Sequence, residues 1–509
     1  MNSFSSNRIF LPLVAIAGII LAVFMGKWVA GGRLLMPGLV IGAIFGAIFF
    51  LTLGRMYWYM IPFALASGLP AIPLGGRTIE LGELSVAACT AIFVARVAMK
   101  KDHLVLFRAS HIPLLLSFAW ICLVWALHPT GFLFLGSEMM GGRYYLKIVL
   151  AFCAFLVMAS QEPTEKDFLR IIYLVFFGVL LKVGYGVLSY FLLGGADAAD
   201  PASQDIDGGG YTWQQILAAP AVIGTYYLFA RYKPSEIFGF QRPFVTAFYL
   251  GALILAALSG KRMGLFIVMT VPFLSAFVFR EYKHIILGAL LGVIGLGVLT
   301  VGHGSIFQLP FTAQRALSWL PGEWDPSLKE LGSSDLFRKE LRTLAIDDIK
   351  KHPIIGQGYA TSISDVLTGM NMIQYGSGLE LEKVAGHAMS KNWHNAWLGY
   401  TADFGIPFTV FYIALLGTAL FLSVRMARSL PHPSTRQIFC VYAFFSLFAK
   451  VLSIHTSGHT ALDAFNLWWL YGLVFAVAAQ VSKERRQEKM ATARVASVAE
   501  DNMPPVPAR

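Results

Sequence analysis

Charged residues are scarce in this sequence. Asp, Glu, Lys and Arg together account for 14% of the 509 residues, whereas 56% are hydrophobic and the mean hydropathy is +0.63. Soluble domains carry about 25% charged residues. The shortage of charge therefore excludes an ordinary soluble protein and indicates a chain that lies largely within a membrane.

Cysteine is rarer still. All of the cysteines fall within apolar runs, where a thiol usually behaves as a small buried hydrophobe. They are Cys89, Cys122, Cys153 and Cys440. Their positions give neither a disulfide framework nor the spacing of a zinc site. We therefore expect no disulfide and no cysteine-bound metal.

Long apolar runs, by contrast, recur along almost the whole chain. A helix needs about 20 mainly apolar residues to cross a bilayer, and about fourteen runs approach that length. They are 9–30, 34–53, 57–74, 81–99, 112–127, 146–159, 168–193, 211–229, 245–258, 263–279, 285–301, 397–424, 438–454 and 464–481. We predict an all-α polytopic membrane protein, with transmembrane helices 1 to 11 in residues 1–301 and helices 12 to 14 in residues 394–482.

The net charge is +11, and the basic residues that produce it sort by the predicted side of the membrane, which argues against a nucleic-acid partner. If every run spans the bilayer, most basic connections fall on one face, and the positive-inside rule makes that face cytoplasmic. Its basic residues are Arg55, Lys100, Lys101, Arg108, Arg231, Lys233, Arg280, Lys283, Arg425, Arg428, Lys483, Arg485 and Arg486. An even number of spans then places both termini in the cytoplasm.

Two segments do not follow the pattern of spans. Residues 302–393 form one outward segment, which is too long for a simple connection and is therefore predicted to be functional. Residues 483–509 begin with charged residues and continue in Ala, Val and Pro, which predicts a disordered cytoplasmic tail.

The outward segment contains one predicted helix and one glycine-containing turn. Residues 336–350 have helical periodicity, and Arg338 and Arg342 share one face of that helix. Gly356 and Gly358 follow, and they would let backbone N–H groups approach a ligand.

Arginines at the outward edge of the apolar runs are the first candidates for chemistry. Arg262 and Arg143 both lie where the chain enters a run. A guanidinium at the edge of hydrocarbon either reaches to water or meets an anion, and its planar fork suits phosphate. We predict anion binding by both. Interfacial anchoring is the alternative for these two, and a solvated helix face is the alternative for Arg338 and Arg342.

His394 is the second candidate, because it lies where the outward segment runs back into an apolar run. An imidazole exchanges a proton near neutral pH, and Lys391 and Asn395 are its close neighbours in the sequence. The alternative is a histidine held by a backbone carbonyl at the start of a helix. Asp403 is predicted to be a buried ion-pair partner rather than a relay to His394. Further histidines on this face have no assigned role: His387, His455 and His459.

Two other kinds of polar residue are candidates for a functional role. His455 and His459 have a pairing with Asp463 nearby that could bind a metal, and this is the weaker interpretation. Lys182 and Lys450 fall within apolar runs, where a charge usually faces a bundle interior or cavity. We predict that Lys182 lines a substrate path, whereas snorkelling is sufficient to explain Lys450.

The segment around His394 resembles a signature of the O-antigen ligase and polymerase superfamily of bacterial membrane glycosyltransferases. His394 and Asn395 are followed after nine residues by Gly405, as in that signature. The family has a second glycine three residues later, and Phe408 stands there in this chain. This departure puts close helix packing at that turn in doubt but leaves the histidine assignment in place.

Two further motifs carry the same resemblance. Residues 352–358 are similar to the family's His-Pro-x-x-Gly-x-Gly element, and residues 259–262 resemble its Ser-x-x-Arg turn. The resemblance covers mainly residues 248–424. It implies a GT-C-like enzyme of the bacterial inner membrane, with a large helical periplasmic loop at residues 302–393.

The resemblance also implies a mechanism that needs no metal or other cofactor. The donor would be a polyprenyl-diphosphate-linked glycan, and transfer would invert the anomeric carbon. His394 would be the general base, and Arg262 and Arg338 would neutralise charge on the diphosphate. Further substrate contacts are expected from Arg143, Arg342, Lys391, Asn395, Gly356, Gly358 and Lys182.

The acceptor is left open by these motifs. A polymerase transfers to another lipid-linked repeat unit, a ligase to lipid A core, and a related oligosaccharyltransferase to a protein hydroxyl. About fourteen spans favour the polymerase slightly. The competing class is a lipid-linked oligosaccharide flippase, which would use Gly- or Pro-broken spans in matching halves of the chain.

Overall fold

A computed structural model describes most of the chain. The described residues are 54–68, 72–74, 77–130, 139–192, 216–239, 242–325, 333–359, 361–362, 393, 395–453 and 460–501. The chain divides into two compact units, residues 1–58 and 59–509. Every element discussed below belongs to the second unit.

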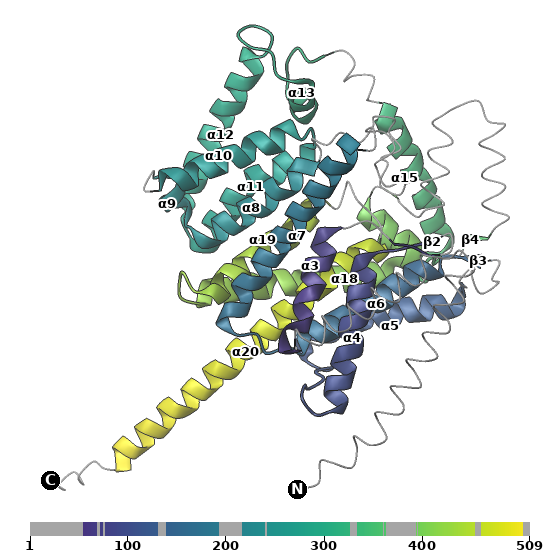
Figure 1. The fold of residues 1–509 in the computed structure, drawn as a ribbon, viewed down its shortest axis with the longest axis vertical. Helices are drawn as coiled ribbons and strands as arrows, with labels where there is room; N and C mark the ends of the chain where they lie inside the picture. The colour runs from purple at the N-terminus through teal and green to yellow at the C-terminus, as the bar shows by residue number, and fades with distance from the viewer. Residues whose placement is uncertain are drawn as a thin grey trace. The chain divides into compact units, whose positions relative to one another are not determined.

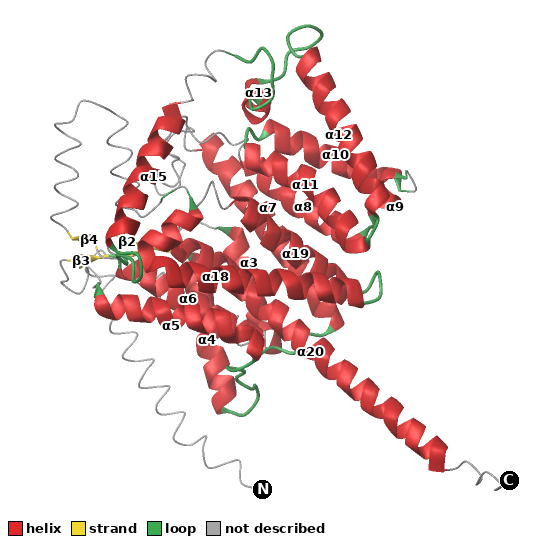
Figure 2. Ribbon diagram, turned by 180° about the vertical axis from the view of Figure 1, so that it is seen from behind, coloured by secondary structure: helices red, strands yellow, loops and turns green. Residues whose placement is uncertain are grey.

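The described residues are predominantly helical, which confirms the all-α prediction (Figure 1). The strands they contain are very short and form two-stranded antiparallel pairs, as Figure 2 shows for β3 and β4. One pair joins β1 (Ile72–Leu74) to β2 (Arg77–Ile79), and the other joins β3 (Met139–Met140) to β4 (Thr361–Ser362).

Nine helices in the described residues are long and apolar enough to cross a membrane. Each coincides with one predicted run. They are α4 (Leu81–Ala98), α5 (Ile112–Leu127, preceded by η2, Ala109–His111), α6 (Gly142–Ala159), α7 (Glu165–Leu192), α11 (Arg262–Phe279), α12 (Tyr282–Gly302), α18 (Ala396–Ser429), α19 (Thr435–Ser453) and α20 (Thr460–Asp501). The chain is therefore a multi-pass membrane protein.

The other predicted runs differ from full spans or lie outside the described residues. Runs 9–30 and 34–53 are not described. The remaining three contain shorter helices: α3 (Met60–Ser67), α8 (Ala218–Arg231) and α10 (Pro243–Leu258). The run at 57–74 is cut short because Gly68 adopts a left-handed conformation that ends α3.

The helices pack around α18, α19 and α20. α20 packs along α6, and α18 contacts α5, α19 and α20. α8 packs against α10, α11 and α19, and it joins the middle of the chain to this core. α18 is bent where Gly405 has φ 78° and ψ 174° and where Pro407 cannot donate a backbone hydrogen bond.

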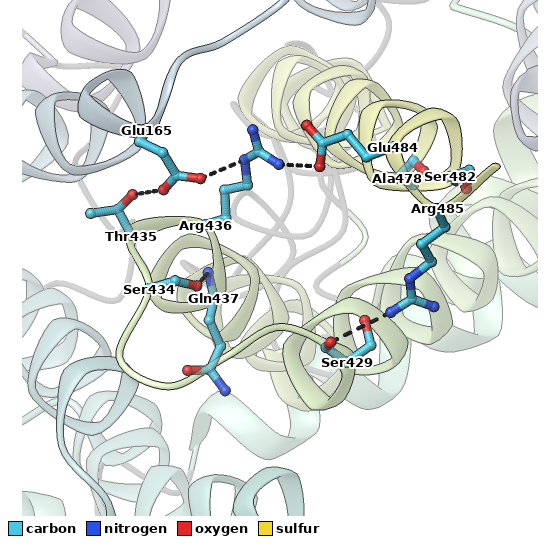
Figure 3. Close-up of polar contacts among 10 residues, drawn as sticks. All are labelled: Glu165, Ser429, Ser434, Thr435, Arg436, Gln437, Ala478, Ser482, Glu484 and Arg485. Carbon is cyan, nitrogen blue, oxygen red and sulfur yellow. Dashed lines mark hydrogen bonds and ion pairs between the residues drawn. The ribbon is translucent and has the colours of Figure 1, made fainter. Parts of the chain in front are cut away.

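An arginine between two carboxylates ties α7, α19 and α20 together at the end predicted to be cytoplasmic (Figure 3). Arg436 Nε lies 2.7 Å from Glu165 Oε1, and Arg436 Nη1 lies 2.6 Å from Glu484 Oε2. The Thr435 hydroxyl also donates to Glu165. The guanidinium side chain is only 14% exposed, so it is shielded from competing solvent.

The helix α20 extends further than the sequence predicted. It continues to Asp501, where a disordered tail was expected from residue 483. The added segment is rich in Ala, Lys, Arg, Glu and Gln, which are strong helix formers. Its described side chains are largely exposed, so helix propensity and not packing accounts for the difference.

Within the outward segment the described residues form two helices. α13 (Phe311–Leu317) lies against α10 and α11, and α15 (Ser333–Lys351) lies against α18. The predicted helix at 336–350 is confirmed. It ends at Lys351 because Pro353 disfavours helical geometry in His352, the residue before it.

Candidate functional site

The residues on either side of His394, at the start of α18, are held by contacts described below. His394 itself lies outside the described residues, as do Lys391, His387, His455 and His459. Asn395 is the N-cap of α18, and its side-chain oxygen accepts a hydrogen bond from Leu398 N at 3.1 Å. This cap uses the amide oxygen and leaves the NH₂ group as the part that could meet a substrate.

Trp393 anchors the other side of His394 in a small apolar cluster. It is 3% exposed and packs with Leu341 and Ala345 of α15 and with Ala402 of α18. Its indole Nε1 donates to the fully buried Asp403 at 3.2 Å. We call this cluster, together with Arg338 and Arg342 of the same helix α15, the α15–α18 junction.

Arg338 and Arg342 lie on the packed side of α15. Each arginine precedes a buried residue of the junction, Leu341 or Ala345, by three positions, and residues three apart share a helix face. Both arginines are nevertheless exposed. The helical spacing thus puts the backbone positions of both arginines near the junction side of α15, with their side chains exposed to solvent.

The turn at Gly356 and Gly358 joins α15 to the bend of α18. Four successive backbone N–H groups donate to protein acceptors: Gly356 to His352 O at 3.0 Å, Gln357 to Ala402 O at 3.0 Å, Gly358 to Asp403 O at 2.7 Å and Tyr359 to the Tyr145 hydroxyl at 3.2 Å. These groups are used in packing, which differs from the ligand contact expected from the sequence. Glycine is required because both residues have positive φ.

Gly405 receives this turn on the α18 side. A Cβ atom there would lie 1.8 Å from Ile354 O, and Ile406 N donates to Pro353 O at 2.9 Å. Close packing thus occurs at Gly405, the position that matches the family signature. Phe408 is fully buried, with its ring 5.1 Å from that of Phe404, so the bulky residue fills an aromatic cluster instead of blocking the contact.

Arg262 lies away from the junction, at the start of α11. Its Nε donates to Arg315 O at 3.1 Å and its Nη2 donates to Ser318 Oγ at 2.8 Å, so it holds the last turn of α13 over the α10–α11 connection. A guanidinium is stabilised by the negative end of a helix dipole. Arg262 remains exposed.

Comparison with known proteins agrees with this geometry. Residues 246–413 match the family model described as O-antigen ligase. The match supports the O-antigen ligase and polymerase superfamily. The matched region, named the ligase domain below, runs from α10 into α18 and contains Arg262, the α15–α18 junction and His394. No curated protein matched the chain.

Arg143 lies outside the ligase domain and is neutralised by acidic residues. Its Nη2 lies 3.5 Å from Glu83 Oε1 and 3.9 Å from Glu80 Oε1. Lys147 Nζ, one turn along α6, lies 2.6 Å from Glu80 Oε1 and 3.7 Å from Glu83 Oε1. We call these four residues the Glu80–Lys147 cluster. Arg143, which the sequence predicted to bind an anionic ligand, is therefore paired with carboxylates of the protein. The sequence did not predict these partners because they lie far from Arg143 in the chain.

Lys182 also lies outside the ligase domain. It is exposed on α7, and its side chain lies against Gly68 at the end of α3. This places the ammonium group at a helix C-terminus, where a cation is favourable. The described contacts of Lys182 do not join it to the α15–α18 junction.

A polar network around Asp463 joins Tyr400 of the ligase domain to Lys450. Lys450 Nζ lies 2.6 Å from Asp463 Oδ1, and the Tyr400 hydroxyl donates to Oδ2 at 2.5 Å. Both carboxylate oxygens are thus used by protein donors, which counts against Asp463 as a metal ligand. Lys450 is paired inside the bundle and does not snorkel, contrary to the explanation taken from the sequence.

Tyr359 ties the outward segment to α20 and was not singled out by sequence reasoning. It is 1% exposed, and its hydroxyl accepts from Ala461 N at 2.9 Å. A Cβ atom at Gly141 would lie 2.0 Å from Tyr359 O, so α6 approaches the same residue closely. The only sequence signal was its place directly after Gly358, at the end of the motif.

Proposed function

We propose that this protein transfers a glycan from a polyprenyl-diphosphate carrier to an acceptor hydroxyl on the periplasmic face of the bacterial inner membrane. The observation that carries the proposal is the α15–α18 junction. There α15, the helix that carries Arg338 and Arg342, packs through Leu341 and Ala345 on Trp393, the direct neighbour of His394, inside a region that matches the O-antigen ligase family.

The arginines would supply positive charge to the diphosphate. Arg338 and Arg342 are exposed, and within the described part of the chain no carboxylate lies at ion-pair distance from either. Their planar forks can contact a phosphate through two N–H groups at once. Arg262, held by α13, would contact the same leaving group, whose developing charge would otherwise slow the reaction.

His394 would act as the general base that accepts the proton of the acceptor hydroxyl. The hydroxyl oxygen then attacks the anomeric carbon as the bond to the diphosphate oxygen breaks, and a single displacement inverts that carbon. The fixed positions of Trp393 and Asn395 support this role, because a general base must be held within hydrogen-bond reach of its proton. Lys391 and the Asn395 NH₂ group are the proposed acceptor contacts.

Among the possible acceptors we place a lipid-linked repeat unit first, which makes the protein a polymerase. Ligation to lipid A core and transfer to a protein hydroxyl are the alternatives. All three use the same donor, so the acceptor alone separates them. Purified protein with one lipid-linked donor and each acceptor in turn would decide: longer lipid-linked glycans indicate a polymerase, and glycosylated lipid A core indicates a ligase.

The chemistry is tested by His394→Ala in the same assay. We expect transfer to fall by about 10²- to 10⁴-fold, the usual contribution of a general base. Lys339→Ala serves as the comparison, because Lys339 is an exposed residue of α15 with no proposed role in the reaction. Full transfer by His394→Ala would remove the histidine from the mechanism, and no donor consumption by the unaltered protein would overturn the enzyme class.

A further inference from the structure

The segment between α12 and residue 320 has an unusual surface for a loop predicted to lie in water. Its large apolar side chains are exposed: Ile306 by 83%, Trp319 by 52% and Phe311 by 47%. Single exposed apolar residues are common on proteins, but a group of them marks an interaction site. We call these three residues, of which Phe311 lies in α13 and the other two lie just before and after it, the α13 apolar face.

The shape of this segment is fixed by its own hydrogen bonds. Gly304 N donates to Phe307 O at 2.9 Å, Leu309 N donates to His303 Nδ1 at 3.3 Å, and Gln314 Nε2 donates to Leu309 O at 2.8 Å. The ring of His303 also stacks on that of Trp324, with centroids 4.9 Å apart. The polar groups are thus satisfied internally, while the apolar side chains point outward.

The neighbouring helix α12 shows which solvent the exposed side chains prefer. Its residues Ile286, Leu290, Ile294, Val298 and Val301 are each more than half exposed and recur every three or four positions, so they form one apolar stripe. α12 is a candidate span that buries very little of itself within the protein. A membrane-spanning helix of this kind faces lipid along that stripe.

The α13 apolar face follows this stripe in the sequence, directly after the end of α12. Val301, at the last turn of α12, is 76% exposed, and Ile306 follows five residues later. On the inner side, Ala313, Ala316 and Leu317 are buried, and α13 contacts α10 and α11. α13 therefore covers the outward ends of two helices while its other side stays uncovered.

The mixture of residues on this surface is typical of a membrane interface. Trp is enriched at the level of lipid headgroups, and arginines there keep their charge in the polar layer. Trp319 directly follows Ser318, which accepts a hydrogen bond from Arg262. One short stretch of chain thus carries both the aromatic side chain and the acceptor that holds the guanidinium.

We infer that residues 303–320 do not stand free in water but rest on the outward leaflet of the bilayer, with the α13 apolar face inserted among headgroups and upper acyl chains. The inference concerns membrane contact alone and does not depend on the proposed transfer reaction. It places Arg262 at the depth of the lipid phosphates, fixed there by α13.

The experiment uses spin labels at Ile306→Cys and Trp319→Cys, in full-length protein reconstituted in lipid nanodiscs, after replacement of Cys89, Cys122, Cys153 and Cys440 by Ala. Accessibility to oxygen, which concentrates in lipid, is compared with accessibility to a water-soluble nickel complex. Val293→Cys on the exposed side of α12 is the lipid control, and Lys339→Cys on the exposed surface of α15 is the water control.

We expect both α13 labels to be more accessible to oxygen than to nickel, as at Val293, and the reverse at Lys339. A nickel response equal to that at Lys339 would overturn the inference. Low accessibility to both reagents, with dipolar broadening that disappears on dilution with unlabelled protein, would assign the surface to a second copy of the chain and would also overturn it.

A second measurement keeps the test decisive if the cysteine-free background does not fold. Tryptophan fluorescence of the natural-cysteine protein is recorded in lipids brominated near the headgroup, for the unaltered chain and for Trp319→Phe. The inference predicts that Trp319→Phe removes a strongly quenched part of the emission. An unchanged quenched fraction would contradict it.

Discussion

The α15–α18 junction and the Glu80–Lys147 cluster both contain arginine on the side predicted to face outward, yet they use it differently. In the cluster, Arg143 and Lys147 meet two carboxylates. At the junction, Arg338 and Arg342 lie on the helix that packs on Trp393, and neither meets a carboxylate within the described residues. A cation with a carboxylate partner stabilises the fold, whereas a cation without one is available to an anionic ligand.

The largest expected effect comes from breaking the Glu80–Lys147 cluster. The Lys147 side chain is 6% exposed and that of Glu83 is 9% exposed. Lys147→Met removes the buried cation of the cluster and leaves both carboxylates with the more exposed Arg143 alone. We expect a loss of about 3 kcal/mol, the lower end for a broken buried pair because Glu80 is partly solvated. Thermal unfolding in detergent measures it. Lys147→Arg, which keeps the charge, should recover most of the stability, and an unfolding midpoint of Lys147→Met equal to the unaltered protein would contradict the assignment.

The next effect is expected at the contact that holds the junction together. Gly405→Ala puts a methyl group against Ile354 O at a positive φ, and overlap together with backbone strain should cost about 2–4 kcal/mol. Gly417→Ala is the matched control, because it lies in the same helix with no atom within 4 Å of the new methyl group. Unfolding midpoints that are equal for the two variants would show that the turn at Gly356 does not dock as described.

The arginines of the junction should affect activity and not stability. Arg338→Ala and Arg342→Ala remove exposed side chains, so the unfolding midpoint should stay near that of the unaltered protein. Loss of a charge-assisted contact worth about 1.5–3 kcal/mol should lower kcat/KM by about 10- to 100-fold. Lys339→Ala, an equally exposed cation on the same helix, should leave transfer unchanged. A similar loss in all three variants would point to general electrostatic attraction instead of specific contacts.

Local pattern predicted much of this protein, and long-range contacts account for the remainder. The apolar runs predicted nine helices, of which α18 and α20 extend beyond their runs. The periodicity of residues 336–350 predicted α15, because apolar runs and periodicity are both properties of neighbouring positions. The role of the turn at Gly356 was missed because its N–H groups are satisfied by Ala402 and Asp403, which lie more than forty positions later in the sequence. The glycines predicted a turn there, but not which acceptors its N–H groups would meet.

The smallest expected effect tests the other side of the comparison. Arg143 is 42% exposed, so its ion pairs are screened by water, and Arg143→Ala should lower stability by less than about 1 kcal/mol. Because Arg143 is already paired with Glu80 and Glu83, Arg143→Ala should change the affinity for the donor by less than about twofold. The sequence alone predicted that Arg143 binds an anion. Arg143→Gln, which keeps length without charge, is the control for packing. A tenfold loss of donor affinity in both variants, with the midpoint unchanged, would show that a carboxylate partner does not exclude a cation from ligand binding, and the distinction between the two regions would then fail.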